Sequence, residues 1–267
     1  MKRFFAVLCS LVYFSACSIG KKDNKSDDIS LAKVYLHEKL KVGIEVPFAP
    51  LVFVDRGNYT GFDVEVINEI CAILDVEPEY VEINWDDKDI YLNSGKVDLL
   101  ASGFSKTPER IGKYGMSNPV IQNMQCVIVR NQERRFENFD SLKGCSIGVQ
   151  QGGTGEAFLT DKINNGFNVE VKAFSSMFSA LAELRENKID AVIGDFIVAT
   201  YILRRNSITD VKILDFAVQN EFYVYAFRKE DITLINAVNE ALAQMAEDGV
   251  LGQITKRWFK NNISLIR

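Results

Sequence analysis

A run of polar and charged residues directly after a buried-strand signal is the first place where this sequence can do chemistry. Residues 97–101 are apolar enough for a strand that is buried on both faces, and residues 102–110 follow it. Ligands of open α/β sheets collect outside the carboxyl ends of the strands. Thr107 can cap a short helix that begins at Pro108, which places Arg110 in the first helical turn. Its guanidinium offers two parallel donors to a carboxylate, although Arg110 alone also fits an ordinary surface charge.

A second group of residues offers the opposite charge and a backbone suited to anions. Asp195 follows a buried-strand signal at 189–193, and Gly152-Gly153-Thr154 opens a predicted helix whose free N–H groups favour an anion. A small dipolar molecule that is buried needs an opposite charge at each end, because desolvation otherwise outweighs its contacts. Arg110 and Asp195 would supply both charges. The alternatives are that Asp195 caps the helix after it and that the glycine pair is a plain turn.

Composition limits the classes of protein to which the chain can belong. Its 267 residues are 47% hydrophobic, which is enough for one large domain or two smaller lobes. The net charge of -5 gives no basic face for nucleic acid. The single histidine, His37, and the lack of a C-x-x-C pair argue against zinc, so we expect no metal and no cofactor. We expect His37 to be exposed.

The first residues have the features of an export signal. Two positive charges precede about a dozen apolar residues, a run that is too short for a comfortable membrane span. The stretch Phe14-Ser15-Ala16-Cys17 resembles a bacterial lipobox, in which the cysteine becomes the lipidated first residue, although Phe14 departs from the usual aliphatic residue. We expect a signal peptide over 1–16, lipidation of Cys17 and a flexible tether over 17–36. A plain signal peptide cut nearby is the alternative.

The elements that must position these groups alternate between strand and helix signals. Strands are predicted at residues 40–44, 77–83, 97–101, 125–129, 145–149, 169–174, 189–193 and 222–227. Helices are predicted at residues 63–74, from 154, at 177–184, at 197–202, from 234 to an end at 248–249, and at 251–258. This order favours open α/β sheets in two lobes, 37–123 with 222–267 and 124–221, linked by extended strands near 120–130 and 217–227. Cys71 fits a helix core, and whether Cys126 and Cys145 pair stays open.

Seven short segments in this order resemble the bacterial extracellular solute-binding protein family for polar amino acids, the receptors of amino-acid ABC importers. The resemblance covers roughly residues 38–260. The segments are 43–50, 61–63, 92–98, 103–110, 148–154, 189–195 and the end, 248–249 with 256–259. Each segment alone is a weak signal, but their order along the chain is specific.

The resemblance implies a fold, a location and partners. The fold would be the two-lobed type II periplasmic-binding-protein fold, with open sheets, flanking helices and two hinge strands. The protein would be a monomer in the periplasm or at the cell surface, held to the membrane through its lipid anchor. It would close on a free L-amino acid and deliver it to a permease and ATPase complex, and it would not be an enzyme.

The resemblance also implies roles for individual residues. Arg110 matches the arginine that grips the α-carboxylate, and Thr154 matches a backbone N–H donor to the same group. Asp195, the carbonyl of Gly103 and the hydroxyl of Ser105 match partners of the α-ammonium. Gly153 stands where the family often has a hydroxyl residue, which would loosen one carboxylate contact.

The residues that would contact the ligand side chain favour a basic amino acid, with glutamine next. Glu45 stands where relatives that take basic or amide side chains often carry an aspartate, and Phe48 matches a stacking aromatic. Trp85 and Phe104 add aromatic faces suited to a cation. The alternatives are that Glu45 forms an ion pair between the lobes and that the aromatic residues belong to the core.

The competing function is a periplasmic enzyme on the same fold, such as a cyclohexadienyl-type dehydratase. A substrate without an α-amino group has no use for Asp195 opposite an ammonium. The sequence also places no second carboxylate as a general acid and no nucleophile beside a histidine. Both observations favour a receptor.

Overall fold

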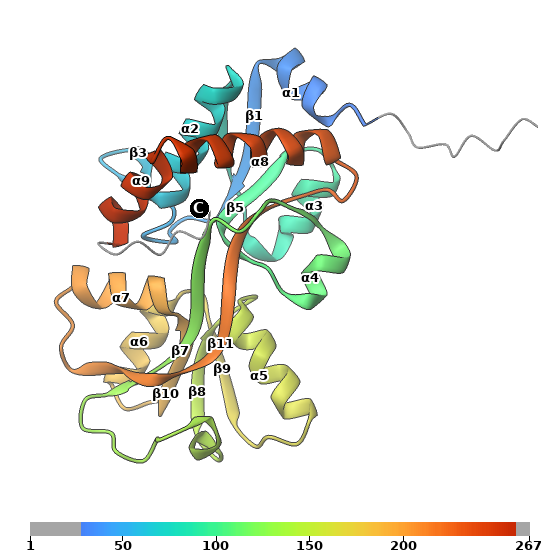
Figure 1. Ribbon diagram of the computed structural model, residues 1–267. Coiled ribbons are helices and arrows are strands. Elements are labelled where there is room, and N and C mark those ends of the chain that lie inside the picture. Colours follow the sequence, from blue (N-terminus) through green and yellow to red (C-terminus); the bar gives the residue numbers. More distant parts are fainter. Residues whose placement is uncertain (1–27, 260–267) are drawn as a thin grey trace, which may run out of the picture.

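The computed structural model describes residues 28–259. The expected signal peptide at 1–16 and the expected lipidation site at Cys17 lie outside the described residues. Within residues 28–259, alternating strands and helices form two α/β lobes, one above the other in Figure 1. The predicted two-lobed α/β architecture with two linking strands is therefore confirmed.

Lobe 1 is built from both ends of the described chain. Its strands are β1 (Lys39–Ile44), β2 (Phe53–Asp55), β3 (Asn58–Thr60), β4 (Glu77–Glu82), β5 (Leu99–Ser105) and β6 (Gly115–Met116). Its helices are α1 (Ser30–His37), α2 (Phe62–Leu74), the 3-10 turn η1 (Trp85–Asp87), α3 (Lys88–Asn93), α4 (Pro108–Lys113), α8 (Ile232–Glu247) and α9 (Val250–Phe259). Lobe 1 thus depends on the last helices for its cover.

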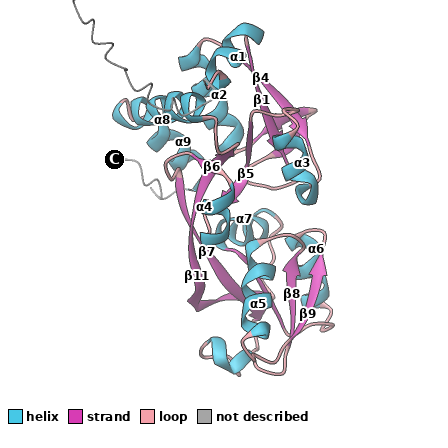
Figure 2. Cartoon of the chain, turned by 90° about the vertical axis from the view of Figure 1, so that its right-hand side faces the viewer, coloured by secondary structure: helices cyan, strands magenta, loops and turns pink. Residues whose placement is uncertain are grey.

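Lobe 2 is one continuous stretch of chain. It comprises η2 (Phe139–Leu142), β8 (Ser146–Gln150), α5 (Thr154–Asn164), β9 (Glu170–Phe174), α6 (Met177–Arg185), β10 (Ala191–Asp195) and α7 (Phe196–Arg205). The strands β7 (Ile121–Arg130) and β11 (Val211–Phe227) run from one lobe to the other along one side of the molecule (Figure 2). The predicted lobe boundaries at 123/124 and 221/222 fall inside these two strands.

One nine-stranded sheet continues through both lobes within the described residues. Its order is β4-β1-β5-β11-β7-β10-β8-β9, with β6 also paired to β11. The strands β4, β1 and β5 are parallel in lobe 1, as are β10, β8 and β9 in lobe 2. The antiparallel pair β11 and β7 joins the two halves. The carboxyl ends of β5 and β10 therefore meet the linking strands, where the sequence placed its candidate residues.

Several expected elements differ from the structure in their bounds, and three of these differences concern the site, a linking strand and the start of the described chain. The predicted strand at 97–101 begins at Leu99 and continues to Ser105, because Ser102, Phe104 and Ser105 are also buried and the last two pair with β11. The predicted strand at 222–227 is the end of a longer strand that begins at Val211.

The third difference lies at the start of the described chain, where the expected flexible tether over 17–36 has to be shortened. Residues 30–36 belong to α1, which packs on α8: Val34 is buried, and the Ser30 hydroxyl lies 3.1 Å from the Thr233 hydroxyl. An apolar residue at Val34 gives this segment something to bury.

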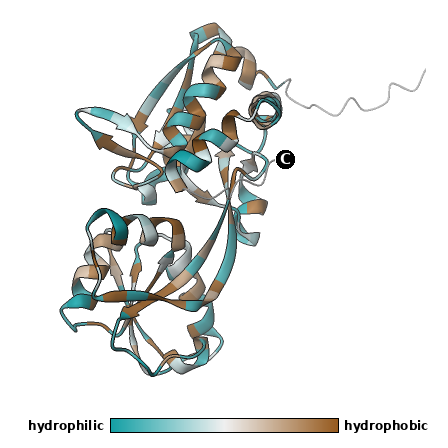
Figure 3. Ribbon diagram, turned by 60° about the vertical axis from the view of Figure 1, so that its left-hand side comes forward, coloured by the Kyte–Doolittle hydropathy of each residue, from teal (hydrophilic) through white to brown (hydrophobic). Residues whose placement is uncertain are grey.

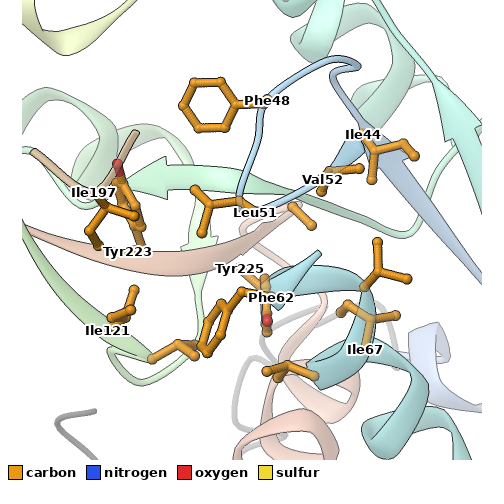
Figure 4. Close-up of a cluster of buried hydrophobic side chains, with 14 of the residues drawn as sticks. Ile44, Phe48, Leu51, Val52, Phe62, Ile67, Ile121, Ile197, Tyr223 and Tyr225 are labelled. Atoms are coloured by element: carbon orange, nitrogen blue, oxygen red, sulfur yellow. The ribbon is translucent and has the colours of Figure 1, made fainter. Parts of the chain in front are cut away.

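The core follows the sheet. Apolar residues gather on strands that lie between helices, and hydrophilic residues lie on the outer loops (Figure 3). The largest cluster of buried side chains passes from lobe 1 through the linking strands into lobe 2, and Figure 4 shows Leu51, Phe62, Tyr223 and Ile197 among its members. A shared core of this kind keeps the lobes attached at the sheet.

The cysteines in the described residues are buried and free, so no disulfide joins Cys126 to Cys145. Cys126 belongs to the shared cluster and Cys145 to a separate cluster of lobe 2. Cys71 is buried in α2, as predicted. His37 is exposed, as predicted, with its Nδ1 2.7 Å from the carbonyl oxygen of Lys33.

None of the helices between residues 28 and 259 has both the length and the apolar character that a membrane span needs.

Candidate binding site between the lobes

A narrow pocket lies where the two lobes meet. Lobe 1 and lobe 2 both line it, through Glu45, Phe48, Trp85, Ser102, Gly103, Ser105, Arg110, Gln150, Gly153, Thr154 and Asp195. The structure thus brings together every predicted ligand-binding residue except Phe104.

Arg110 is held at the pocket by its own helix start. Its backbone N–H donates to the Thr107 hydroxyl at 3.3 Å, the cap that the sequence predicts for α4. Its Nη1 donates to the carbonyl oxygen of Ser105 at 3.0 Å, and the guanidinium carbon lies 4.4 Å from the centre of the Phe104 ring. Burial lowers the pKa of Arg110, but the group stays charged because its ordinary pKa is far above neutrality. The rest of the guanidinium remains available to an anion.

Phe104 does not line the pocket, so its predicted contact with a ligand is not supported. The side chain is fully buried beneath Arg110, with edge contacts to Trp85 and Tyr114 at ring-centre distances of 5.9 and 5.0 Å. Side chains alternate along a strand, so Phe104 faces away from the pocket that its neighbours Gly103 and Ser105 line. Phe104 instead forms the floor on which the guanidinium rests.

Asp195 presents one oxygen to the protein and leaves the other free. Its Oδ1 accepts hydrogen bonds from Asn123 Nδ2 at 2.6 Å, from Gln125 Nε2 at 3.1 Å and from the Tyr223 hydroxyl. Its Oδ2 has no hydrogen-bond partner among residues 28–259. Asp195 precedes α7, but its side chain does not cap that helix, which excludes the alternative role. Burial, and then the negative charge of Glu221, raises the pKa of Asp195 above its ordinary value.

The bend that brings Gly103 to the pocket is fixed by Asp63. Ser102 and Gly103 both have positive φ, 76° and 65°, in the middle of β5. Their backbone N–H groups donate to Asp63 Oδ2 at 3.0 and 2.9 Å. A Cβ on Gly103 would lie 2.7 Å from side-chain atoms of Phe48 and Leu51, so only glycine fits here. Asp63 is therefore structural, and it does not line the pocket.

Lobe 2 contributes the start of α5. Thr154 is the first residue of this helix, Gly153 precedes it, and both line the pocket. N–H groups in the first helical turn have no partner within the helix. The nearby Gly152 N–H is already taken by Glu156 Oε2 at 2.7 Å. An anion in the pocket can thus be reached from Arg110 on one lobe and from a helix start on the other.

Glu45 and two aromatic side chains form another part of the pocket wall. The backbone N–H of Glu45 donates to Ser102 Oγ at 3.0 Å, and its carboxylate forms no ion pair with the described residues. The inter-lobe ion pair considered for Glu45 is therefore not formed. Burial, and then the charge of Asp86, raises the pKa of Glu45 to about 7, while Lys88 opposes them. Trp85 is mostly buried and still borders this space.

Six residues of the site were missed by sequence reasoning. Ser102 and Gln150 line the pocket, and Asn123, Gln125, Tyr223 and Glu221 surround the carboxylate of Asp195. Alternating polar residues in an otherwise apolar strand were the available signal for Asn123 and Gln125. Glu221 follows Gln219 and Asn220, which gives a polar run typical of an exposed segment, and no signal distinguished it.

Within the part of the chain that the structure describes, no group of three or more His, Cys, Asp and Glu side chains is placed to hold a metal ion.

Comparison with known proteins agrees with the geometry. Residues 40–261 match the family described as bacterial extracellular solute-binding proteins, family 3. The chain is 29% identical over 241 residues to the L-cystine-binding protein TcyJ of Escherichia coli K12, covering 90% of this chain and 89% of that protein.

Two solved structures share the whole fold. The crystal structure of Tv2483 bound to L-arginine has a TM-score of 0.82 at 29% identity and covers 90% of this chain and 98% of the other. The ancestral amino acid-binding protein AncCDT-1, a precursor of cyclohexadienyl dehydratase, has a TM-score of 0.78 at 29% identity and covers 86% and 99%. These likenesses confirm the predicted type II periplasmic-binding-protein fold.

Proposed function

The chain belongs to the bacterial extracellular solute-binding proteins of family 3, and we propose that it captures a free L-amino acid and delivers it to an ABC importer. The observation that carries the proposal is the placement of Arg110 and Asp195 on different lobes of one pocket. A zwitterion needs a partner for each of its charges when it leaves water. Two partners on two lobes make ligand binding and lobe closure one event.

Each end of the amino acid has a set of partners in this proposal. Arg110 and the backbone N–H of Thr154 hold the α-carboxylate, with Gly153 beside them. The free Oδ2 of Asp195, the carbonyl of Gly103 and the hydroxyl of Ser105 hold the α-ammonium. The closed form makes all of these contacts, so the ligand shifts the population of the protein towards closure.

The ligand side chain would lie against Glu45, Phe48 and Trp85. A cationic side chain suits them best, because it pairs with the Glu45 carboxylate and stacks on aromatic faces. The bound L-arginine of the similar structure supports a basic ligand. L-Glutamine is second, and the L-cystine of the similar E. coli protein is a further candidate to be tested.

Dehydratase activity on the same fold is the alternative, and its support is the likeness to AncCDT-1. We propose that this chain is a receptor without enzyme activity, because Asp195 directs a free carboxylate oxygen at the position of an ammonium. Incubation with prephenate-like acids, followed by chromatography, separates the two functions. Product formation by the wild-type protein would favour the enzyme.

We also propose an exported monomer that is anchored to the membrane through a lipid on Cys17. The support is the signal-like start of the sequence and the extracellular character of the family. Metabolic labelling with a radioactive fatty acid tests the anchor, with Cys17→Ser as the control variant. Equal labelling of both proteins would reject lipidation at this residue.

A thermal-shift screen of the twenty amino acids and L-cystine tests the main proposal. A ligand that binds the folded state alone raises the apparent melting temperature by mass action. We expect L-arginine, L-lysine or L-ornithine to give the largest rise, and Arg110→Ala to abolish it. A screen in which no amino acid shifts the transition would overturn the proposed function.

A further inference from the structure

Glu221 is a buried carboxylate that lies behind the pocket and touches no part of its surface. It sits on β11, only 1% exposed, where this strand passes between the lobes. No lysine or arginine of residues 28–259 lies within ion-pair distance of it. Its partners are instead polar groups: the Ser105 hydroxyl, Gln125 and Gln219. The position of this buried carboxylate, without an ion-pair partner and next to the proposed binding site, therefore calls for a functional explanation.

The contact with Ser105 determines what that serine can offer to a ligand. Ser105 lines the pocket, and its hydroxyl donates to Glu221 Oε2 at 2.7 Å. A serine hydroxyl has a single hydrogen to donate and two acceptor lone pairs. With its hydrogen committed to Glu221, Ser105 presents only acceptor capacity to the pocket. Its carbonyl oxygen is meanwhile occupied by Arg110.

Gln125 ties Glu221 to the second carboxylate of the site. Its Nε2 donates to Glu221 Oε2 at 3.2 Å and to Asp195 Oδ1 at 3.1 Å. Both hydrogens of one amide are thus used by two carboxylates that no described cation neutralises by an ion pair. The negative charge of Glu221 and Asp195 is therefore concentrated on the side of the pocket that Ser105 and Asp195 form. A ligand ammonium would be the missing counter-charge.

We propose that Glu221 is a positioning residue that makes the pocket selective for an α-ammonium, by holding the Ser105 hydroxyl as an acceptor. This inference rests on the proposed function. A neutral group in place of the ammonium, such as the methylene of a desamino acid, leaves the acceptor of Ser105 and Oδ2 of Asp195 unpaired. Unpaired buried polar groups are costly, which is how a site rejects a ligand that lacks the matching donor.

The isosteric change Glu221→Gln reverses this arrangement. The new amide removes the negative charge behind Ser105. With its nitrogen at the former Oε2 position, where Gln125 must give up its hydrogen bond, it donates to Ser105 Oγ and frees the serine hydrogen to point towards the ligand. Asp215→Asn is the matched control, since Asp215 lies on the same strand, is exposed and carries the same charge. Calorimetry would compare L-arginine with 5-guanidinopentanoate, and L-glutamine with glutaramate, which differ only in the α-amino group.

For Glu221→Gln we expect the amino acid to bind at least tenfold more weakly, while the desamino acid binds as weakly as before or better. Asp215→Asn should match the wild-type protein with both ligands. A preference for the amino acid that stays at the wild-type ratio in Glu221→Gln would overturn the inference. If the wild-type protein binds no amino acid at all, the proposed function falls, and this inference falls with it.

A double-mutant cycle with Ser105→Ala tests whether Glu221 acts through the serine. Residues that act as one unit give non-additive effects. We expect Ser105→Ala alone to reduce the preference for the amino acid, and Glu221→Gln to change it by less than twofold in that background. Fully additive losses would reject the route through Ser105. Should Glu221→Gln fail to fold, an unchanged preference in Ser105→Ala would overturn the inference by itself.

Discussion

The division of charge among a few residues explains why an amino acid would be both bound and distinguished. Arg110 rests on the ring of Phe104 and gives one of its donors to Ser105, which leaves a pre-oriented guanidinium at the pocket. Asp195 has one oxygen saturated and the other free. Both side chains are held in place by these contacts, and such pre-organisation reduces the entropy cost of binding.

Replacement of Arg110 by alanine should cost about 3–5 kcal/mol of binding free energy, because it strands a buried ligand carboxylate. The control is Arg257→Ala, which removes an exposed arginine that pairs with Glu65 on the surface. Calorimetry with L-arginine measures both variants. Affinity that is unchanged in Arg110→Ala would remove this residue from the site.

The raised pKa of Glu45 predicts a pH dependence that differs between ligands. Its carboxyl has a pKa of about 7 in the ligand-free protein, chiefly because of burial. A cationic side chain needs the ionised form, so affinity for L-arginine should rise from about pH 6 to about pH 8 more than affinity for L-glutamine. Asp195, which contacts the shared α-ammonium, affects both ligands alike, so their ratio reports Glu45.

The variant Glu45→Gln should abolish this change in the ratio and weaken L-arginine selectively, roughly tenfold or 1.4 kcal/mol. Calorimetry at several pH values would show it. The sign for stability is opposite: a carboxyl whose pKa is raised by folding holds its proton more tightly in the folded state. The contribution of Glu45 to the stability of the ligand-free protein should therefore fall as pH rises from 4.5 to about 7. A ligand ranking that is identical in Glu45→Gln would contradict the role of this residue.

At the scale of elements, the bend in β5 is what converts a sheet strand into a binding surface. Two successive residues with positive φ interrupt the pairing with β11, and Asp63 of α2 compensates their two N–H groups. Burial raises the pKa of Asp63 to about 6 in spite of these hydrogen bonds, so the carboxylate is held at some cost. Helix α2 thus supports the bend through the side chain of Asp63, on the side of β5 that faces away from the pocket.

Gly103→Ala tests this bend, and Gly95→Ala is its matched control. Both glycines have positive φ, 65° and 72°, but a Cβ on Gly95 meets nothing within 4 Å. The control should lose about 1–2 kcal/mol of stability from backbone strain alone. Gly103→Ala should lose about 1–3 kcal/mol more from the clash with Phe48 and Leu51, and ligand affinity with it. Urea denaturation measures the difference, and equal losses would mean that the pocket wall adapts.

The element pattern shows where sequence reasoning succeeds and where it stops. Period and capping signals predicted α4 with Thr107 as its cap and α5 beginning at Thr154, because these features depend on neighbours in the chain. Phe104 and Glu221 were misjudged or missed, since their environment is made by residues far away in sequence. Phe104 is covered by Arg110, and Glu221 meets Ser105 across 116 positions. Local patterns carry no information on such contacts.

At the scale of the molecule, the lobes are joined on one side by β7 and β11 and touch on the other side through few contacts. Gln151 Nε2 of lobe 2 donates to Asp86 Oδ2 of lobe 1 at 3.2 Å. Phe53 of lobe 1 and Tyr201 of α7 lie 6.1 Å apart between ring centres, at the edge where α7 approaches α9 in Figure 1. Contacts that are few and polar or aromatic can be broken and remade, which suits reversible closure around a ligand.

The variant Tyr201→Ala tests closure without touching the ligand, because Tyr201 does not line the pocket. The contact with Phe53 forms only when the lobes approach, and apparent affinity scales with the population of the competent form. An aromatic pair contributes about 0.5–1.5 kcal/mol, so binding should weaken roughly 2- to 12-fold. The loss should be equal for L-arginine and L-glutamine, since a change in closure cannot distinguish ligands that meet the same closed form.

The control for this prediction is Tyr35→Ala, which removes an exposed tyrosine of α1. Calorimetry gives the affinities, and small-angle X-ray scattering should show that saturating ligand still contracts the variant. A loss confined to one ligand would instead place Tyr201 in the binding site, and no loss would mean that this edge does not contribute to closure.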